Sequence, residues 1–281
     1  MRNLVLGCAQ FGKGYGLYIN TPEMPRTQIA EILELAHAEG IKDLDLAQGY
    51  EGAVSNLASI ALRDRFRVGT KIRYHNTTES RISEMLSLDL VALKLSYFES
   101  ILIHDWSELN DSEKNSSLIF LNKLKNQGIT KQIGISIYEK EELDNINEKI
   151  DIVQGPLNFF NTELLSDDQA YKLATNGASF HARSIFHQGT LLNTNALPKK
   201  HGNEIDRFHD YLTKHQLTSM QGALSVFDSQ KLFTNLVVGV ANPSQLFEVS
   251  RTPIASLDNF MEDVPQNTSI DLRDPRKWVS P

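Results

Sequence analysis

The sequence has a single cysteine, Cys8, so an internal disulfide is excluded. It has no apolar run of about 18 residues, the length of a membrane-spanning helix, and no apolar leader near its N-terminus. Acidic residues outnumber basic ones, 35 against 28, and the net charge is −7. No basic stripe would attract nucleic acid or an anionic membrane. These absences predict a cytoplasmic protein without a nucleic-acid or membrane partner, and they leave the oligomeric state open.

What the chain does contain is enough apolar sequence for a large core. Hydrophobic residues make up 41% of the 281 residues and charged residues 22%, which is typical of a globular protein. No linker or low-complexity segment divides the chain. Cys8 lies in the apolar run Leu4–Cys8, which favours a small buried side chain over a reactive thiol. The length suits one large α/β barrel or two small domains.

Short apolar segments alternate with amphipathic ones along the chain. The apolar segments predict eight strands: Leu4–Ala9, Leu44–Ala47, Arg67–Ile72, Ser100–His104, Gln132–Ile137, Ile150–Pro156, Ala178–Phe186 and Leu236–Val240. The amphipathic segments predict helices: Arg26–Glu39, Val54–Leu62, Ser80–Leu88, Asp111–Gln127, Lys140–Asn147, Asp167–Asn176, Glu204–Phe227 and Pro243–Arg251.

Eight strand–helix units of about 35 residues each are typical of a (β/α)₈ TIM barrel. We therefore predict one α/β domain over residues 1–281, with the tail from about residue 252 lying across one barrel end. The competing fold is a doubly wound sheet, which would carry a glycine fingerprint after its first strand. Gly12-Lys-Gly-Tyr-Gly16 stands there and does not fit that fingerprint.

Four polar residues stand at or near the ends of the second, third and fourth predicted strands. Asp45, Lys71 and His104 are about one strand–helix unit apart, and Tyr50 follows Asp45 by five residues. In a barrel of this type the active site lies at the C-terminal ends of the strands. Adjacent parallel strands would therefore bring these side chains together at one end of the barrel.

Such a cluster suits proton transfer to an oxyanion. Free tyrosine has a pKa near ~10, and a neighbouring ammonium favours the phenolate and lowers that pKa. Asp45 would hold Lys71 charged, while His104 would orient a carbonyl oxygen towards Tyr50. Simpler interpretations also exist: the Asp45–Lys71 pair is a structural ion pair, Tyr50 a packing aromatic, and His104 a core histidine.

At these residues the sequence resembles the aldo-keto reductase superfamily, and the resemblance extends over nearly the whole chain. Asp45–Tyr50 resembles the Asp-Thr-Ala-x-x-Tyr motif of that family, and Leu6–Gly12 its opening strand and loop. Gly69–Lys71 and Ile103–Asp105 resemble the segments with its catalytic lysine and histidine. The resemblance implies Tyr50 as the proton donor in the reduction of a small carbonyl substrate, an aldehyde or ketone. The tail is similar to that of bacterial members associated with sugar metabolism.

The resemblance also covers the family's cofactor segments and implies NADPH, with NADH as the alternative. Strand ends at Ile133–Ser136 and Val153–Gln154 resemble those that hydrogen-bond the nicotinamide amide. Ala182–Gly189 resembles the segment under the ring and pyrophosphate, and Val238–Gln245 the phosphate-binding turn. The implied cofactor-binding residues are Ser136, Gln154, Asn158, Arg183, Ser184, Gly189, Gly239, Ala241, Asn242 and Gln245.

The phosphate-binding turn also has a physical basis of its own. Asn242 is a good N-cap and Pro243 a good first helical residue, so the helix would begin with exposed amides that suit a phosphate.

Four positions depart from the family pattern. Leu46 replaces threonine, Glu51 replaces glycine, and Arg183 stands where many members stack an aromatic ring on the nicotinamide. A guanidinium can stack there or bind an acidic substrate. Gln245 stands where many NADPH-dependent members have arginine, which leaves the choice between NADPH and NADH open.

These departures motivate an alternative function, a nucleotide-binding barrel without catalysis, acting as a sensor or scaffold. A metal-dependent hydrolase is a third class, but the sequence predicts no metal site. The histidines that would have to supply ligands show no ligand spacing: His181, His187, His201, His209 and His215.

Overall fold

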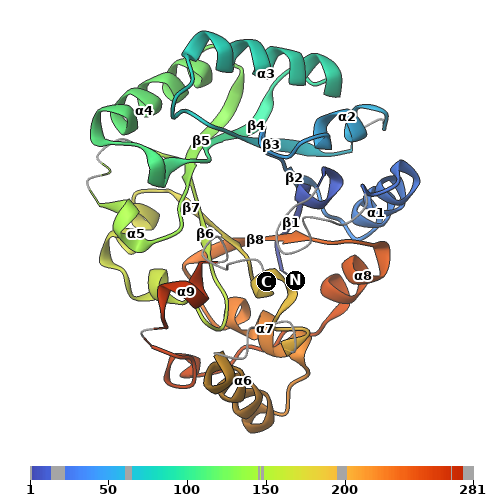
Figure 1. Cartoon of the computed structure of the whole chain (residues 1–281), viewed down its shortest axis with the longest axis vertical. Helices are drawn as coiled ribbons and strands as arrows, with labels where there is room; N and C mark the ends of the chain where they lie inside the picture. The colour runs from blue at the N-terminus through green and yellow to red at the C-terminus, as the bar shows by residue number, and fades with distance from the viewer. Residues whose placement is uncertain are drawn as a thin grey trace.

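The structure, a computed structural model, describes residues 2–13, 23–60, 65–144, 146, 149–194, 201–266 and 268–274. Its parallel strands form a closed barrel in the order β1 to β8, with helices arranged around it (Figure 1). The predicted (β/α)₈ barrel is therefore confirmed. The strands are β1 Leu4–Gly7, β2 Asp43–Asp45, β3 Arg67–Ile72, β4 Phe98–Ile103, β5 Thr130–Ser136, β6 Ile152–Pro156, β7 Ser179–Arg183 and β8 Phe233–Gly239.

The helices follow the predicted order with two exceptions. They are α1 Arg26–Ala38, α2 Ala53–Ala58, α3 Glu79–Leu93, α4 Asp111–Asn126, α5 Asp168–Thr175, α6 Gly202–His215, α7 Ser219–Asp228, α8 Pro243–Arg251 and α9 Ile270–Arg273. The predicted helix Lys140–Asn147 is wrong: the structure has one 3₁₀ turn, Lys140–Leu143, and Asp144 leaves it in an extended conformation.

The single predicted helix Glu204–Phe227 is also wrong, because two helices occupy it. Gln216 has φ 54° and ends α6 in the left-handed region. Thr218 then begins α7 with a capping box, in which its side chain accepts from the Gln221 amide. The apolar residues keep their helical spacing across this break, so the break cannot be seen in the apolar pattern. Figure 1 shows α6 lying outside α7, farther from the barrel.

Side-chain alternation along the strands fills the barrel from inside and packs its outer face against the helices. Glycine is required where the interior is narrow: a Cβ on Gly134 would lie 2.0 Å from the Ile152 carbonyl oxygen. A Cβ on Gly69 would lie 2.4 Å from the Ser100 hydroxyl. Both glycines leave room for larger polar side chains nearer the C-terminal ends of the strands.

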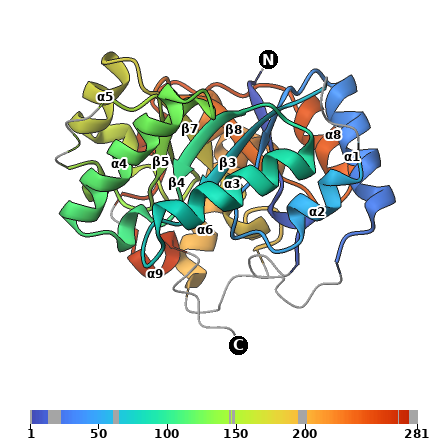
Figure 2. The same ribbon diagram turned by 90° about the horizontal axis from the view of Figure 1, so that it is seen from above.

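The C-terminal segment contacts the loops that follow β5, β6 and β7. Arg273 of α9 forms ion pairs with Glu139 and Glu163. His187, in the loop after β7, donates from Nε2 to the Leu272 carbonyl oxygen over 2.7 Å, and its Nδ1 lies 2.7 Å from the Thr190 hydroxyl. α9 therefore marks the C-terminal end of the barrel, at the lower side of Figure 2. Within the described ranges, no helix is long and apolar enough to cross a membrane.

Two histidines, His181 on β7 and His187 in the loop after it, predict a loss of stability in mild acid. Burial lowers the pKa of His181 and of His187 to about 4. Because these values lie below the ordinary 6.5, the unfolded chain binds the protons first, and stability falls as the pH drops from 6.5 towards 4. Each histidine accounts for up to about 3 kcal/mol. Urea unfolding should show a free energy several kcal/mol lower at pH 4.5 than at pH 7.

The matched variant is His187→Gln, whose side chain does not titrate. We expect a smaller difference between pH 4.5 and pH 7 in this variant than in the wild type. Equal stability of the wild type at both pH values would contradict the assignment of buried, neutral histidines.

Candidate active site

The centre of the site is a buried ion pair between two neighbouring strands. Asp45 ends β2, and Lys71 lies on β3 two residues beyond Gly69, the register partner of Asp45. Lys71 is 2% exposed, and its Nζ lies 2.5 Å from Asp45 Oδ2 and 3.4 Å from the Leu46 carbonyl oxygen. A buried ammonium needs a carboxylate and further acceptors to remain charged. The structure therefore supplies a fixed positive charge at this end of the barrel.

The second oxygen of Asp45 is held from the opposite wall. Gln154, on β6, donates from Nε2 to Asp45 Oδ1 over 3.1 Å and is buried with it. Lysine and amide together fix both carboxylate oxygens. The sequence had indicated Gln154 only as a cofactor residue, because a contact between strands so far apart has no local signature.

Tyr50 lies above the ion pair. It belongs to the turn after β2, where its amide donates to the Ala47 carbonyl and its carbonyl accepts from the Ala53 amide. Lys71 Nζ lies 5.5 Å from the centre of the Tyr50 ring. The His104 ring meets the Tyr50 ring edge-on, with ring centres 6.0 Å apart and an angle of 87° between them. Asp45, Tyr50, Lys71 and His104 are thus brought together.

The strand ends explain why His104 lies beside Tyr50. The His104 amide donates to the Ile72 carbonyl over 2.8 Å, which continues the pairing of β3 and β4 past the last residue of β4. Asp105 then turns the next loop: its carboxylate accepts the amides of Tyr74 and His75 over 2.9 to 3.1 Å. Asp105 is thus a supporting residue, a role that no sequence motif indicates.

Two of the departures from the family pattern leave this geometry intact. Leu46 is 1% exposed and lies in the hydrophobic core, and its amide still pairs with the Gly69 carbonyl. Glu51 points outwards, while its carbonyl accepts the Lys13 amide over 2.8 Å. Gly12 permits this approach of the first loop, because a Cβ there would lie 2.6 Å from the Glu51 carbonyl oxygen.

Buried polar side chains continue from the ion pair along β5 and β6. Ser136 ends β5, pairs in register with Gln154, and is 2% exposed. Asn158 follows β6 and donates from Nδ2 to the Ser184 carbonyl over 3.2 Å. Ser184 has φ 62°, a left-handed conformation that turns the chain sharply after β7. Buried hydroxyl and amide groups therefore lie on this wall of the site, and the Asn158 oxygen already accepts the Phe160 amide over 2.9 Å.

The turn after β8 is held by its own side chains. Asn242 caps α8 through the Gln245 amide, and the Gln245 side chain accepts the Ala241 amide over 2.7 Å. The Ala241 carbonyl accepts from Gln28 of α1 over 2.6 Å. Gly239 precedes this turn with Gln10 packed against it, since a Cβ would lie 2.3 Å from Gln10 Oε1. Gln245 thus stabilises the turn, whose residues 239–245 carry no charged side chain.

Two further side chains, His181 and Cys8, lie near the site. His181 on β7 faces the barrel interior, where burial lowers its pKa and the negative charge of Asp45 partly opposes that shift. Cys8 is completely buried behind Asp45, its amide donates to the Asp45 carbonyl, and burial raises the pKa of its thiol. Cys8 is therefore an unreactive packing residue, as its apolar surroundings predicted.

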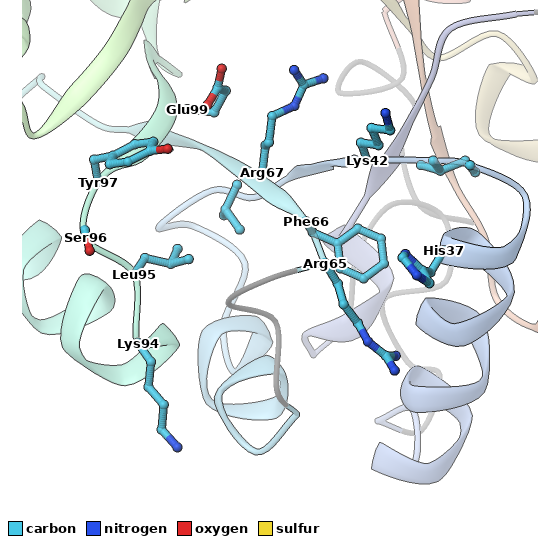
Figure 3. A pocket seen from close by; sticks show the side chains of 13 residues that line it. His37, Lys42, Arg65, Phe66, Arg67, Lys94, Leu95, Ser96, Tyr97 and Glu99 are labelled. Carbon is cyan, nitrogen blue, oxygen red and sulfur yellow. The ribbon is translucent and has the colours of Figure 1, made fainter.

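A cavity of about 550 Å³ lies at the other end of the barrel (Figure 3). It is lined by residues that precede β2, β3 and β4, among them His37, Phe66 and Leu95. None of the four clustered side chains lines it. No three His, Cys, Asp or Glu side chains in the described part of the chain are placed to hold a metal ion.

Comparison with known proteins identifies the class of this fold and site. The family model "Aldo/keto reductase family" matches residues 3–253, so the chain belongs to that family. Aldo-keto reductase family 1 member C3 from Homo sapiens is 25% identical over 171 residues, 51% of this chain and 52% of that protein. The same-named protein from Pongo abelii is 24% identical over the same share. The chain thus matches these relatives over about half their length.

Solved structures share the fold at low identity. Aldo-keto reductase AKR11C1 from Bacillus halodurans, in its holo form, has a TM-score of 0.71 at 16% identity, covering 97% of this chain and 95% of that one. A structure described as a putative aldo-keto reductase from Pseudomonas aeruginosa has a TM-score of 0.67 at 16% identity, covering 88% of each chain. These likenesses confirm the barrel.

Proposed function

We propose that this protein is an NAD(P)H-dependent oxidoreductase that reduces an aldehyde or ketone to an alcohol, with Tyr50 as the general acid. The observation that carries the proposal is the buried Asp45–Lys71 pair beneath the Tyr50 ring, with His104 against its edge. A structural ion pair would not need a phenol and an imidazole assembled above it. Family membership supports the same class of reaction.

Each residue has a role that its position supports. Tyr50 donates its proton to the carbonyl oxygen as negative charge develops there. The Lys71 ammonium stabilises the phenolate that remains, because the two groups are close in a poorly solvated site. Asp45 and Gln154 hold that ammonium in place. His104, beside the Tyr50 ring, orients the substrate oxygen.

The residues present fit a nicotinamide cofactor, which supplies the hydride when bound. Ser136, Gln154 and Asn158 place polar groups at the ends of β5 and β6, where a carboxamide could be hydrogen-bonded. The start of α8 offers a phosphate site, consistent with its capped N-terminus. Ser184, Gly189, Gly239, Ala241, Asn242 and Gln245 complete the proposed cofactor surface. We favour NADPH. NADH is the alternative because the turn after β8 has no cation for a 2′-phosphate.

The test is a screen of both cofactors against a panel of aldehydes, ketones and keto sugars, in which oxidation of the reduced cofactor is monitored by its absorbance at 340 nm. Cofactor oxidation that depends on the carbonyl supports the proposal. Tight cofactor binding, seen by fluorescence, with no oxidation by any carbonyl would instead support the non-catalytic nucleotide-binding barrel.

A further inference from the structure

Arg183 is fixed at the rim of the proposed active site. Phe180 and Ala182 of β7 are fully buried in the hydrophobic core, so strand alternation turns His181 and Arg183 towards the barrel axis. Arg183 pairs in register with Pro156, two residues beyond Gln154, which reaches Asp45. The guanidinium therefore belongs to the same end of the barrel as the ion pair.

Three contacts determine the orientation of the guanidinium. Nη2 donates to the Ile137 carbonyl oxygen over 2.8 Å, across the end of β6, and Nη1 donates to the Ser184 hydroxyl over 3.2 Å. Cζ lies 4.2 Å from the centre of the Tyr138 ring. An arginine held by two hydrogen bonds and an aromatic ring loses little further entropy when it binds a ligand.

Among the described residues, this cation has no carboxylate counter-ion. None of the carboxylates in the described ranges forms an ion pair with Arg183, whereas Arg73 and Arg273, at the same end of the barrel, are both paired. A guanidinium carries five N–H donors, and the described part of the chain accepts hydrogen bonds from the two donors named above. The side chain is only partly buried, so its remaining donors are open to a ligand.

We propose that Arg183 binds an anionic group of the carbonyl substrate, a carboxylate or a phosphate. This proposal rests on the proposed function and names the substrate class of the same site. A planar guanidinium matches both oxyanions through paired, charge-assisted hydrogen bonds. Its fixed position on β7, on the rim of the end that holds Tyr50, would anchor the anionic end of a substrate whose carbonyl group meets the phenol.

The experiment compares matched pairs of aldehydes in wild type and Arg183→Gln. The pairs are 4-carboxybenzaldehyde with 4-methylbenzaldehyde, and glyceraldehyde 3-phosphate with glyceraldehyde. We expect the wild type to favour the anionic member of at least one pair, and the ratio of kcat/KM values to fall by about 10- to 100-fold in the variant, as for one lost charge-assisted contact. The pair that responds distinguishes carboxylate from phosphate.

Arg73→Gln is the matched control. Arg73 is an exposed arginine in the loop after β3 and already pairs with Glu108. We expect the preference for the anionic aldehyde to remain in this variant. A wild type that favours neutral aldehydes in both pairs, or a ratio that Arg183→Gln leaves unchanged, would overturn the proposal.

Binding without turnover gives an independent readout. Calorimetry should show that 4-carboxybenzyl alcohol binds the cofactor-free wild type more tightly than 4-methylbenzyl alcohol, and that Arg183→Gln removes the difference. If no carbonyl is reduced but this difference holds, the proposed function fails while the anion site remains. A fall in NADPH affinity with an unchanged substrate ratio would assign Arg183 to the cofactor and overturn the proposal.

Discussion

Replacing Tyr50 by phenylalanine is expected to lower kcat for carbonyl reduction by at least about 100-fold, the effect of a lost general acid. The ring would still pack against His104 and over Lys71, because neither contact uses the hydroxyl. Cofactor affinity and the unfolding midpoint should therefore stay close to the wild-type values. Steady-state kinetics, with cofactor binding measured by fluorescence, would separate the chemical step from binding.

Tyr97→Phe is the control for this substitution. Tyr97 lines the cavity at the opposite end of the barrel (Figure 3). The Lys131 ammonium lies 4.3 Å from the centre of its ring. Removing its hydroxyl should leave kcat unchanged. A Tyr50→Phe enzyme with turnover within about threefold of the wild type would remove Tyr50 from the mechanism.

Lys71→Met is expected to have two large effects. It leaves the Asp45 carboxylate buried without its counter-charge, which should lower the free energy of unfolding by about 3–5 kcal/mol. It also removes the ammonium that stabilises the Tyr50 phenolate, so kcat should fall by at least about 100-fold. Urea unfolding and steady-state kinetics measure the two effects separately.

The double variant Asp45→Asn/Lys71→Met separates stability from catalysis. With both charges gone, no uncompensated ion is buried, and Gln154 can still hydrogen-bond the asparagine. Most of the lost stability should therefore return, while turnover stays low. Recovery of turnover together with stability would show that the pair is a structural ion pair, the simpler interpretation of these residues.

The fold was predictable because each strand of a barrel is a local apolar segment of the sequence. The bounds predicted for β3 and α8 are the observed ones. The fifth helix was wrong because Lys140–Leu143 has helical spacing, but the chain leaves that spacing after one 3₁₀ turn. The break between α6 and α7 depends on the left-handed Gln216, which leaves no trace in the apolar periodicity.

The side-chain cluster was predictable from topology alone. Once Asp45 and Lys71 stand near the ends of adjacent parallel strands, register brings them together. Contacts across the barrel were not predictable in this way. The hydrogen bond from Gln154 to Asp45 and the contact of Arg183 with Ile137 join strands that do not pair, and only the closed barrel brings them within reach.

Hydride transfer is the most direct test of the central claim that this barrel reduces carbonyl groups. NADPH or NADH carrying deuterium at the reactive C4 position would be incubated with the enzyme and the best aldehyde, and the alcohol analysed by mass spectrometry. The account predicts one deuterium on the carbinol carbon of the product from the wild type and a far slower appearance from Tyr50→Phe. Cofactor that binds the wild type while no carbonyl in the panel acquires deuterium would contradict it.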